Sequence, residues 1–262
     1  MPPVSAALAR IYESPEEPDP QQQGGMSFLE HLEELRIRII RSLMAIAAGM
    51  AIAFYFIDDI VQFLLEPTLR TLPPGAMLIY TQPGEGFSFW FNIALIAGTI
   101  LASPFVFLQV WLFIAPALHA REKKFVIPFV LLTTSGTLAG AAFSHYVMFP
   151  SMMRFFGLFN TPHQLAFMPR VSDVYSLYLR MLMGMVGVFQ LPTFAFFLAR
   201  LGLVNAGWLW RNFRYAILII FIVAAVLTPS PSPTDQIVFA APMIVLYVLS
   251  IGIAWMAAPR RS

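Results

Sequence analysis

The sequence predicts an all-α polytopic membrane protein with six transmembrane helices. Of its 262 residues, 58% are apolar and only 11% are charged, and the mean hydropathy is +0.73. A soluble domain is typically about 45–50% apolar and about 25% charged. The composition therefore argues against a soluble enzyme, and the absence of cysteine argues against a disulfide-stapled or thiolate-based protein.

Six apolar stretches approach the length of about 20 residues that a spanning helix needs. They cover 40–57, 88–115, 126–149, 178–199, 214–228 and 237–257. The fifth stretch is the weakest, because Arg214 and the proline-rich run after Thr228 leave it short. Prolines in or beside the stretches remove intrahelical hydrogen bonds and predict kinked helices; they are Pro104, Pro116, Pro128, Pro192 and Pro242.

The distribution of Lys and Arg predicts the orientation. One side of the predicted bundle carries twelve of the 16 basic residues, in the N-terminal segment, the connections near 116–125 and 200–214, and the C-terminus. The other side has only Arg70, Arg154 and Arg170. Both termini are therefore expected in the cytoplasm.

The domain organisation is simple. Residues 1–25 are polar and rich in Pro and Gln, which predicts a disordered tail rather than a signal peptide. Residues 26–258 form the six-helix domain, and residues 259–262 are a basic end. The Met- and Phe-rich segment 150–170 is interpreted as an interfacial lid.

Acidic residues on the predicted cytoplasmic side are few. Residues 27–42 have the pattern of an amphipathic helix lying on the membrane surface before the first span, with Glu34 four positions before Arg38. Glu122 is the acid of the second cytoplasmic connection. These carboxylates suit ordinary local ion pairs, and they equally suit a cationic partner gripped through guanidinium groups.

Polar residues within the predicted spans are the other candidates. Gln109, Arg180 and Gln190 stand in apolar surroundings, where such side chains usually face protein or a wet cavity. Thr228 closes the fifth span. Arg180 is also compatible with snorkelling to the interface, and Gln190 with a structural hydrogen bond between helices.

Catalytic and cofactor motifs are missing from the sequence. It has no phosphate-binding loop, no GxSxG and no HExxH, and its four histidines show no metal-ligand spacing. We therefore expect no enzyme activity, no cofactor, no metal and no nucleic-acid partner.

Four motifs together resemble those of the TatC family, the signal-peptide receptor subunit of the twin-arginine protein translocase. They are FLEHLEELRIRI at 28–39, SPFVFLQVWLFIAPAL at 103–118 with Glu122 following, GVFQLP at 187–192, and LTPSPSPTDQ at 227–236. The resemblance extends from about Met26 to Ala257. It implies a glove-shaped six-helix bundle in the bacterial cytoplasmic (inner) membrane.

The resemblance also implies a function and its residues. It assigns a cytoplasmic patch for twin-arginine signal peptides to Glu34 and Glu122, with Arg36, Gln109 and Phe113 nearby. Membrane lipid and small single-span subunits of the TatA/TatB type are the implied partners, in a hetero-oligomer that exports folded precursors with the proton-motive force.

Three positions depart from the family pattern. Gln190, Ser232 and Val248 stand where acids are common, which weakens any proton relay through them. With Arg180 and Thr228, Gln190 forms the candidate intramembrane or subunit-binding set. The alternative function from the residues alone is a small-solute or ion transporter, although the two halves of the chain show no matched repeats.

Overall fold

The computed structural model describes residues 28–71, 77–114, 126–157, 168–228 and 233–257. These segments are almost entirely helical, and their one β pairing is an isolated parallel bridge between Ile79 and Arg170. The elements are α2 (Phe28–Tyr55), α3 (Ile57–Thr71), α4 (Glu85–Ile114), α5 (Val126–Phe143), a π-helical turn η4 (Ser144–Met148), α6 (Phe149–Gly157), α7 (Val171–Val188), α8 (Leu191–Arg200), α9 (Ala206–Arg211), α10 (Phe213–Leu227) and α11 (Pro233–Ala257).

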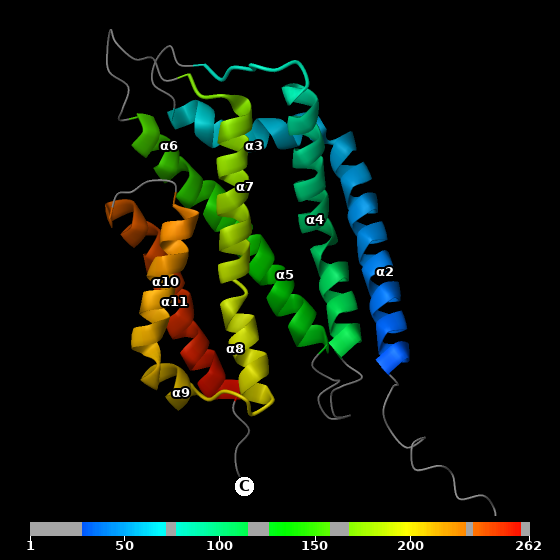
Figure 1. The fold of residues 1–262 in the computed structure, drawn as a ribbon, viewed down its shortest axis with the longest axis vertical. Coiled ribbons are helices and arrows are strands. Elements are labelled where there is room, and N and C mark those ends of the chain that lie inside the picture. Colours follow the sequence, from blue (N-terminus) through cyan, green and yellow to red (C-terminus); the bar gives the residue numbers. More distant parts are fainter. Residues whose placement is uncertain (1–27, 72–76, 115–125, 158–167, 229–232, 258–262) are drawn as a thin grey trace, which may run out of the picture.

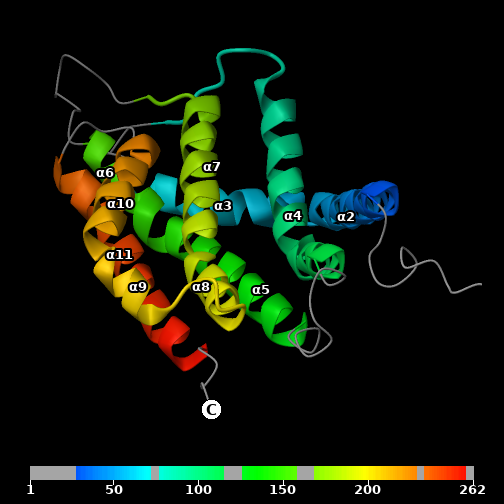
Figure 2. The same cartoon turned by 60° about the horizontal axis from the view of Figure 1, so that its bottom comes forward.

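The long helices run between two ends of the molecule, as Figure 1 shows. At the first, here called the terminal end, α2 begins and α11 ends, and the end of α4, the start of α5 and α9 lie there too (Figure 1). At the opposite end, called the α3 end, α3 lies crosswise to α4 and α7 in both views (Figures 1 and 2). The start of α2 and the end of α11 are thus on one side, as an even number of passes requires.

Five helical segments are long and apolar enough to cross a membrane by length and composition: Leu29–Tyr55, Glu85–Ile114, Val126–Gly157, Val171–Arg200 and Gln236–Ala257. The fifth predicted span, 214–228, corresponds to α10, which has 15 residues and falls short of that length. At 1.5 Å per residue α10 extends about 22 Å, against a hydrocarbon core of about 30 Å. The chain is a multi-pass membrane protein in which five helical segments of the described residues meet the criterion and α10 does not.

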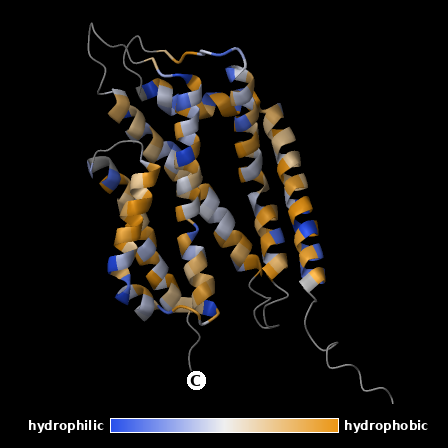
Figure 3. Cartoon of the chain, viewed as in Figure 1, coloured by the Kyte–Doolittle hydropathy of each residue, from blue (hydrophilic) through white to orange (hydrophobic). Residues whose placement is uncertain are grey.

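Hydrophobic residues make up most of the length of these helices, and hydrophilic residues gather mostly near their ends (Figure 3). Large side chains such as Leu43, Met44 and Leu218 are more than half exposed. Such a surface is suited to lipid rather than water, because lipid chains are as apolar as these residues. The interior, by contrast, is rich in methionine, whose flexible side chain fills irregular gaps: Met148, Met152, Met153, Met181, Met185 and Met243 are fully buried or nearly so.

The first helix differs from its prediction. Residues 28–42 do not form a separate helix on the membrane surface; they are the first half of the continuous helix α2, which packs along α4. Two glycines make this packing close, because a Cβ added to Gly49 would lie 2.5 Å from the carbonyl oxygen of Gly98, and one added to Gly98 would lie 2.4 Å from the backbone nitrogen of Met50. Both distances are too short for any side chain.

The interruptions of the spans were only partly predicted. The span containing Gln190 breaks into α7 and α8 at Phe189 and Gln190, just before Pro192. Pro104 and Pro242, by contrast, lie inside α4 and α11. The span starting at Val126 changes to η4 at Ser144, where no proline or glycine marks the position.

Two further differences concern the α3 end. The sequence analysis did not predict α3 as a helix. The predicted lid is also wrong for the part that is described, because α6 packs against α3 and η4 and buries Met152 and Met153. The predicted tail 1–25, the basic end 259–262 and residues 158–167 lie outside the described residues.

Candidate functional site

The predicted recognition residues that the structure describes lie where α2 and α4 meet at the terminal end. Arg38 donates from Nη2 to Glu34 Oε1 at 3.1 Å and from Nη1 to Gln109 Oε1 at 3.2 Å. The first bond is the i,i+4 ion pair considered for the sequence, and the second joins α2 to α4. One turn from these contacts, the His31 ring stacks on Phe113 with 4.5 Å between centroids. We call these five residues the Glu34 cluster.

The Glu34 cluster is half-buried and incompletely paired. The Glu34 and Arg38 side chains are 15% and 19% exposed, and Gln109 is buried. Among the described residues, Glu34 Oε2 and Arg38 Nε have no hydrogen-bond partner. A buried carboxylate oxygen without a donor is costly, so this atom is a ready acceptor for an additional N–H group.

The other two predicted recognition residues are Arg36 and Glu122. Arg36 is exposed on α2, and it is Arg38 that contacts Glu34. Glu122 lies outside the described residues, as does Ser232. The structure therefore places Glu34, Gln109 and Phe113 together and leaves Arg36 on another face of the helix.

Gln190 occupies the break between α7 and α8. Its Nε2 donates to the carbonyl oxygen of Thr133 and to Thr137 Oγ1, each at 3.0 Å. Thr137 in turn donates to the Thr133 carbonyl, so its hydroxyl oxygen is free to accept. The approach is possible because Gly136 on α5 faces the Phe189 carbonyl oxygen, 2.9 Å from where a Cβ would stand. The structural hydrogen bond considered for Gln190 is present.

The other amide atom of Gln190, Oε1, is buried without a partner among the described residues. Gln190 lines a cavity of about 230 Å³ between α4, α5 and α8. Five of the twelve lining residues are aromatic, and three of them, Trp111, Phe129 and Phe197, contact one another at ring-centroid distances of 5.0–5.2 Å. We call this space the Gln190 cavity; it extends from Gln190 to Arg200, the last residue of α8.

Arg180 and Thr228 are not part of this cavity. Arg180 is exposed on α7 and lines a shallow cavity of about 330 Å³ with Asp173 and Ser176. Thr228 is buried, and its hydroxyl donates to the carbonyl oxygen of Ala224, which closes the last turn of α10. The structure thus does not bring Gln190, Arg180 and Thr228 into one polar site.

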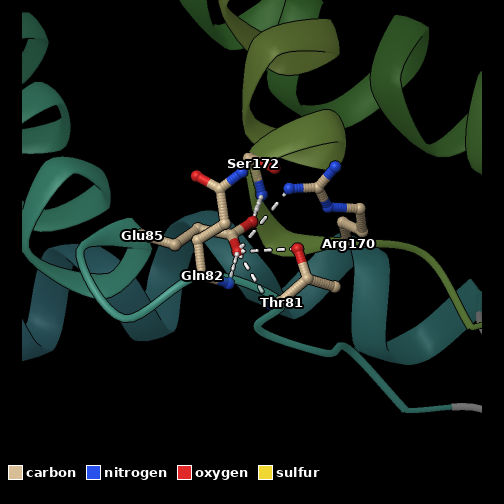
Figure 4. Close-up of polar contacts among 5 residues, drawn as sticks. All are labelled: Thr81, Gln82, Glu85, Arg170 and Ser172. Atoms are coloured by element: carbon tan, nitrogen blue, oxygen red, sulfur yellow. Dashed lines mark hydrogen bonds and ion pairs between the residues drawn. The ribbon is translucent and has the colours of Figure 1, made fainter.

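Glu85, at the start of α4, is a buried acid that the sequence analysis missed (Figure 4). Its Oε2 accepts from the backbone N–H groups of Thr81 at 2.8 Å and Gln82 at 3.2 Å, and its Oε1 accepts from the backbone N–H of Ser172 at 3.1 Å. Arg170 lies 4.0 Å from the same carboxylate. Glu85 therefore joins the segment before α4 to the start of α7, beside the bridge of Ile79 with Arg170.

No group of three or more His, Asp or Glu residues in the described ranges is arranged to hold a metal ion. The polar contacts described above join helices to one another: the Glu34 cluster joins α2 to α4, and Gln190 joins α5 to the break between α7 and α8.

Comparisons with known proteins all match one family. The family model described as Sec-independent protein translocase protein (TatC) matches residues 30–242. The chain is 44% identical to the Sec-independent protein translocase protein TatC of Koribacter versatilis over 239 residues, covering 90% of this chain and 88% of the relative. It is 37% identical to the TatC protein of Desulforapulum autotrophicum, covering 86% and 82% of the two chains. A crystal structure of a twin-arginine translocase receptor, TatC, superimposes with a TM-score of 0.73 at 32% identity, covering 87% of this chain and 99% of that one.

Proposed function

The chain belongs to the TatC family of Sec-independent protein translocase proteins, and from this premise we propose that it is the receptor and core subunit of a twin-arginine translocase. In this role it binds the signal peptides of folded precursors and recruits small single-span subunits of the TatA/TatB type. It has no catalytic activity of its own, and the proton-motive force drives export. The family favours this function over the small-solute transporter that the sequence left open.

The observation that carries the proposal is the unpaired Oε2 of Glu34. Glu34 already accepts one N–H from Arg38, and its second oxygen is buried and free of donors among the described residues. A guanidinium group has a planar fork of donors that a lysine ammonium lacks. An arginine of the signal peptide is therefore the side chain best suited to complete this carboxylate. Glu122 is proposed to supply the second carboxylate, by the family resemblance.

Charge alone does not give tight binding. An exposed ion pair contributes about 0–1 kcal/mol, and a hydrogen bond to a charged group about 1.5–3 kcal/mol. Burying one leucine-sized side chain contributes about 1.5–3 kcal/mol. We propose that the apolar stretch of the signal supplies most of the affinity by packing against the bundle, with the Gln190 cavity as an apolar surface at the same end as the Glu34 cluster.

The experiment is site-specific crosslinking of a twin-arginine precursor to the full chain in membranes. Glu34→Gln keeps the size of the side chain and removes its charge, so we expect at least about a tenfold loss of crosslinking, which corresponds to about 1.4 kcal/mol. Glu33→Gln is the matched control, because Glu33 is the adjacent acid and is exposed. Glu122→Gln should behave like Glu34→Gln. Equal crosslinking in the wild type, Glu34→Gln and Glu122→Gln would overturn the assignment of the patch.

We also propose six spans with both termini in the cytoplasm of a bacterium and the α3 end on the outer side of the inner membrane. The short helix α10 is the fifth of these spans in chain order. The chain has no cysteine, so single cysteines at Thr81 and Ser262 report their sides without further engineering. An impermeant maleimide should label intact cells or spheroplasts at position 81 and spare position 262. Labelling of both positions would contradict the topology.

A further inference from the structure

A second, basic cavity lies at the α3 end, between α3, η4 and α6. Its volume is about 210 Å³, and its polar lining comes from Glu66 and Arg70 on α3, His145 and Tyr146 on η4, and Arg154 on α6. We call it the Arg154 cavity. None of these residues belongs to the Glu34 cluster or to the Gln190 cavity.

The charge of the Arg154 cavity is positive. Arg70 is paired with Glu66, the acid of this lining, in an exposed i,i+4 ion pair. Arg154 is exposed and has no acidic partner among the described residues. An exposed pair of this kind is weak, so Arg70 remains available to an anion that Arg154 also contacts.

The inner wall of the cavity is rigid. His145 is only 3% exposed; its ring stacks on Phe63 with 4.1 Å between centroids, and the Tyr178 hydroxyl lies 3.4 Å from its Nδ1. The π-helical turn positions His145 and Tyr146 side by side at this wall. The shape of the cavity is thus held by contacts that α3, η4 and α7 each contribute.

Exposed apolar side chains lie beside the cavity. A neighbouring depression of about 450 Å³ shares Glu66 and Arg70 with it, and its other lining residues are Asp59, Gln62, Phe63 and Leu69. Phe63, Leu69 and Tyr146 are 47%, 58% and 65% exposed. Helix α3 has one buried face and one exposed face that carries both charged and apolar residues, and it lies crosswise to the spans (Figures 1 and 2). This is the placement of a helix in the membrane interface, at the depth of lipid headgroups.

We propose that the Arg154 cavity binds the phosphate of an anionic phospholipid, with Arg154 and Arg70 contacting the phosphate and an acyl chain lying over Phe63 and Leu69. The positive charge of the cavity selects a phosphate, and the exposed Phe63 and Leu69 beside it select a phosphate that carries hydrocarbon chains. Free inorganic phosphate would leave these two side chains uncovered.

The test measures phosphatidylglycerol bound to the full-length protein after transfer into nanodiscs of mixed phosphatidylglycerol and phosphatidylcholine. A basic side chain at the interface contributes about 1 kcal/mol of attraction to anionic lipid, so each of Arg70→Gln and Arg154→Gln should lower the phosphatidylglycerol enrichment about fivefold. The control is Arg214→Gln, which removes one exposed arginine at the start of α10, at the terminal end. It should leave the phosphatidylglycerol enrichment unchanged, because Arg214 does not line the Arg154 cavity.

Two results would overturn the proposal. One is wild-type enrichment in the Arg70→Gln, Arg154→Gln double variant. The other is stabilisation of the detergent-purified protein by inorganic phosphate as strong as that by phosphatidylglycerol, since a free-anion site would then suffice. If the glutamine variants do not fold, Arg154→Lys keeps the charge and should retain most of the bound lipid at an unchanged unfolding temperature.

Discussion

The close contact between Gly49 and Gly98 lets α2 pack along α4, and we expect the Glu34 cluster, which joins the same two helices, to depend on this packing. A Cβ added at position 98 would lie 2.4 Å from the backbone nitrogen of Met50, about 1 Å closer than the 3.4 Å at which ordinary contacts begin. The obstruction is backbone, which cannot rotate away as a side chain does. In Gly98→Ala the two helices must therefore separate by about 1 Å.

The cost follows from known effects of overpacking, which are about 1–3 kcal/mol. Alanine also favours a helix over glycine by up to about 1 kcal/mol, so a control must share that gain. Gly252→Ala does so, because Gly252 lies within α11 with nothing within 4 Å of its would-be Cβ. The difference between the two variants isolates the clash. Separation would also stretch the 3.2 Å bond from Arg38 to Gln109 beyond hydrogen-bonding distance.

The assay is thermal unfolding of the purified variants in one detergent, with crosslinking of a twin-arginine signal as a second readout. Gly98→Ala should unfold at a lower temperature than Gly252→Ala and should crosslink the signal less well. Equal unfolding temperatures would refute the argument from close helix packing. A destabilised Gly98→Ala that crosslinks normally would refute the dependence of the Glu34 cluster on that packing.

Three further substitutions test other contacts. Gln190→Leu removes two hydrogen bonds between α5 and the break between α7 and α8, each of which contributes about 0.6 kcal/mol within a membrane. We expect the free energy of unfolding to fall by about 1 kcal/mol. A variant as stable as the wild type would show that these bonds contribute nothing to stability. Glu85→Ala leaves three backbone N–H groups without their acceptor. Amide hydrogen exchange at Val171 and Ile79 should therefore be faster than in the control Asp173→Asn, which alters an exposed acid. Equal exchange in the two variants would contradict the role of Glu85 in joining the segment before α4 to the start of α7. Trp111→Ala removes a buried side chain and should lower the free energy of unfolding by about 3–5 kcal/mol. The control Trp210→Ala, at a site that is 65% exposed, should lower it far less. Similar losses of stability in the two variants would exclude Trp111 as a packing residue.

The helices were predictable where hydrophobicity alone determines them. The stretches at 88–115 and 237–257 correspond to α4 and α11 because long apolar runs have no alternative in lipid. Helix α3 was missed because Asp58, Asp59 and Glu66 lower its hydropathy. Its structure depends on a buried face packed across the ends of other helices, which periodicity over 15 residues does not reveal.

For the candidate site, the sequence allowed residues to be selected by their type, but it did not allow their contacts to be predicted. For Gln190, a structural hydrogen bond between helices and a role in a polar binding site were both open interpretations. The hydrogen bond could not be predicted, because its acceptors on Thr133 and Thr137 lie more than 50 residues away in the sequence. Glu85 was overlooked because its partner Ser172 is 87 residues away. The nearer signal is Thr81, which lies four positions before an acid that starts a helix.

Arginine selectivity is the central claim, and co-purification tests it most directly. The full chain is co-expressed with a folded precursor carrying either a twin-arginine signal or the same signal with two lysines, and the precursor retained per receptor is measured. We expect strong retention of the arginine form and a loss of at least about tenfold for the lysine form, because only arginine offers Glu34 a planar fork of N–H donors. Equal retention of the two precursors would contradict it.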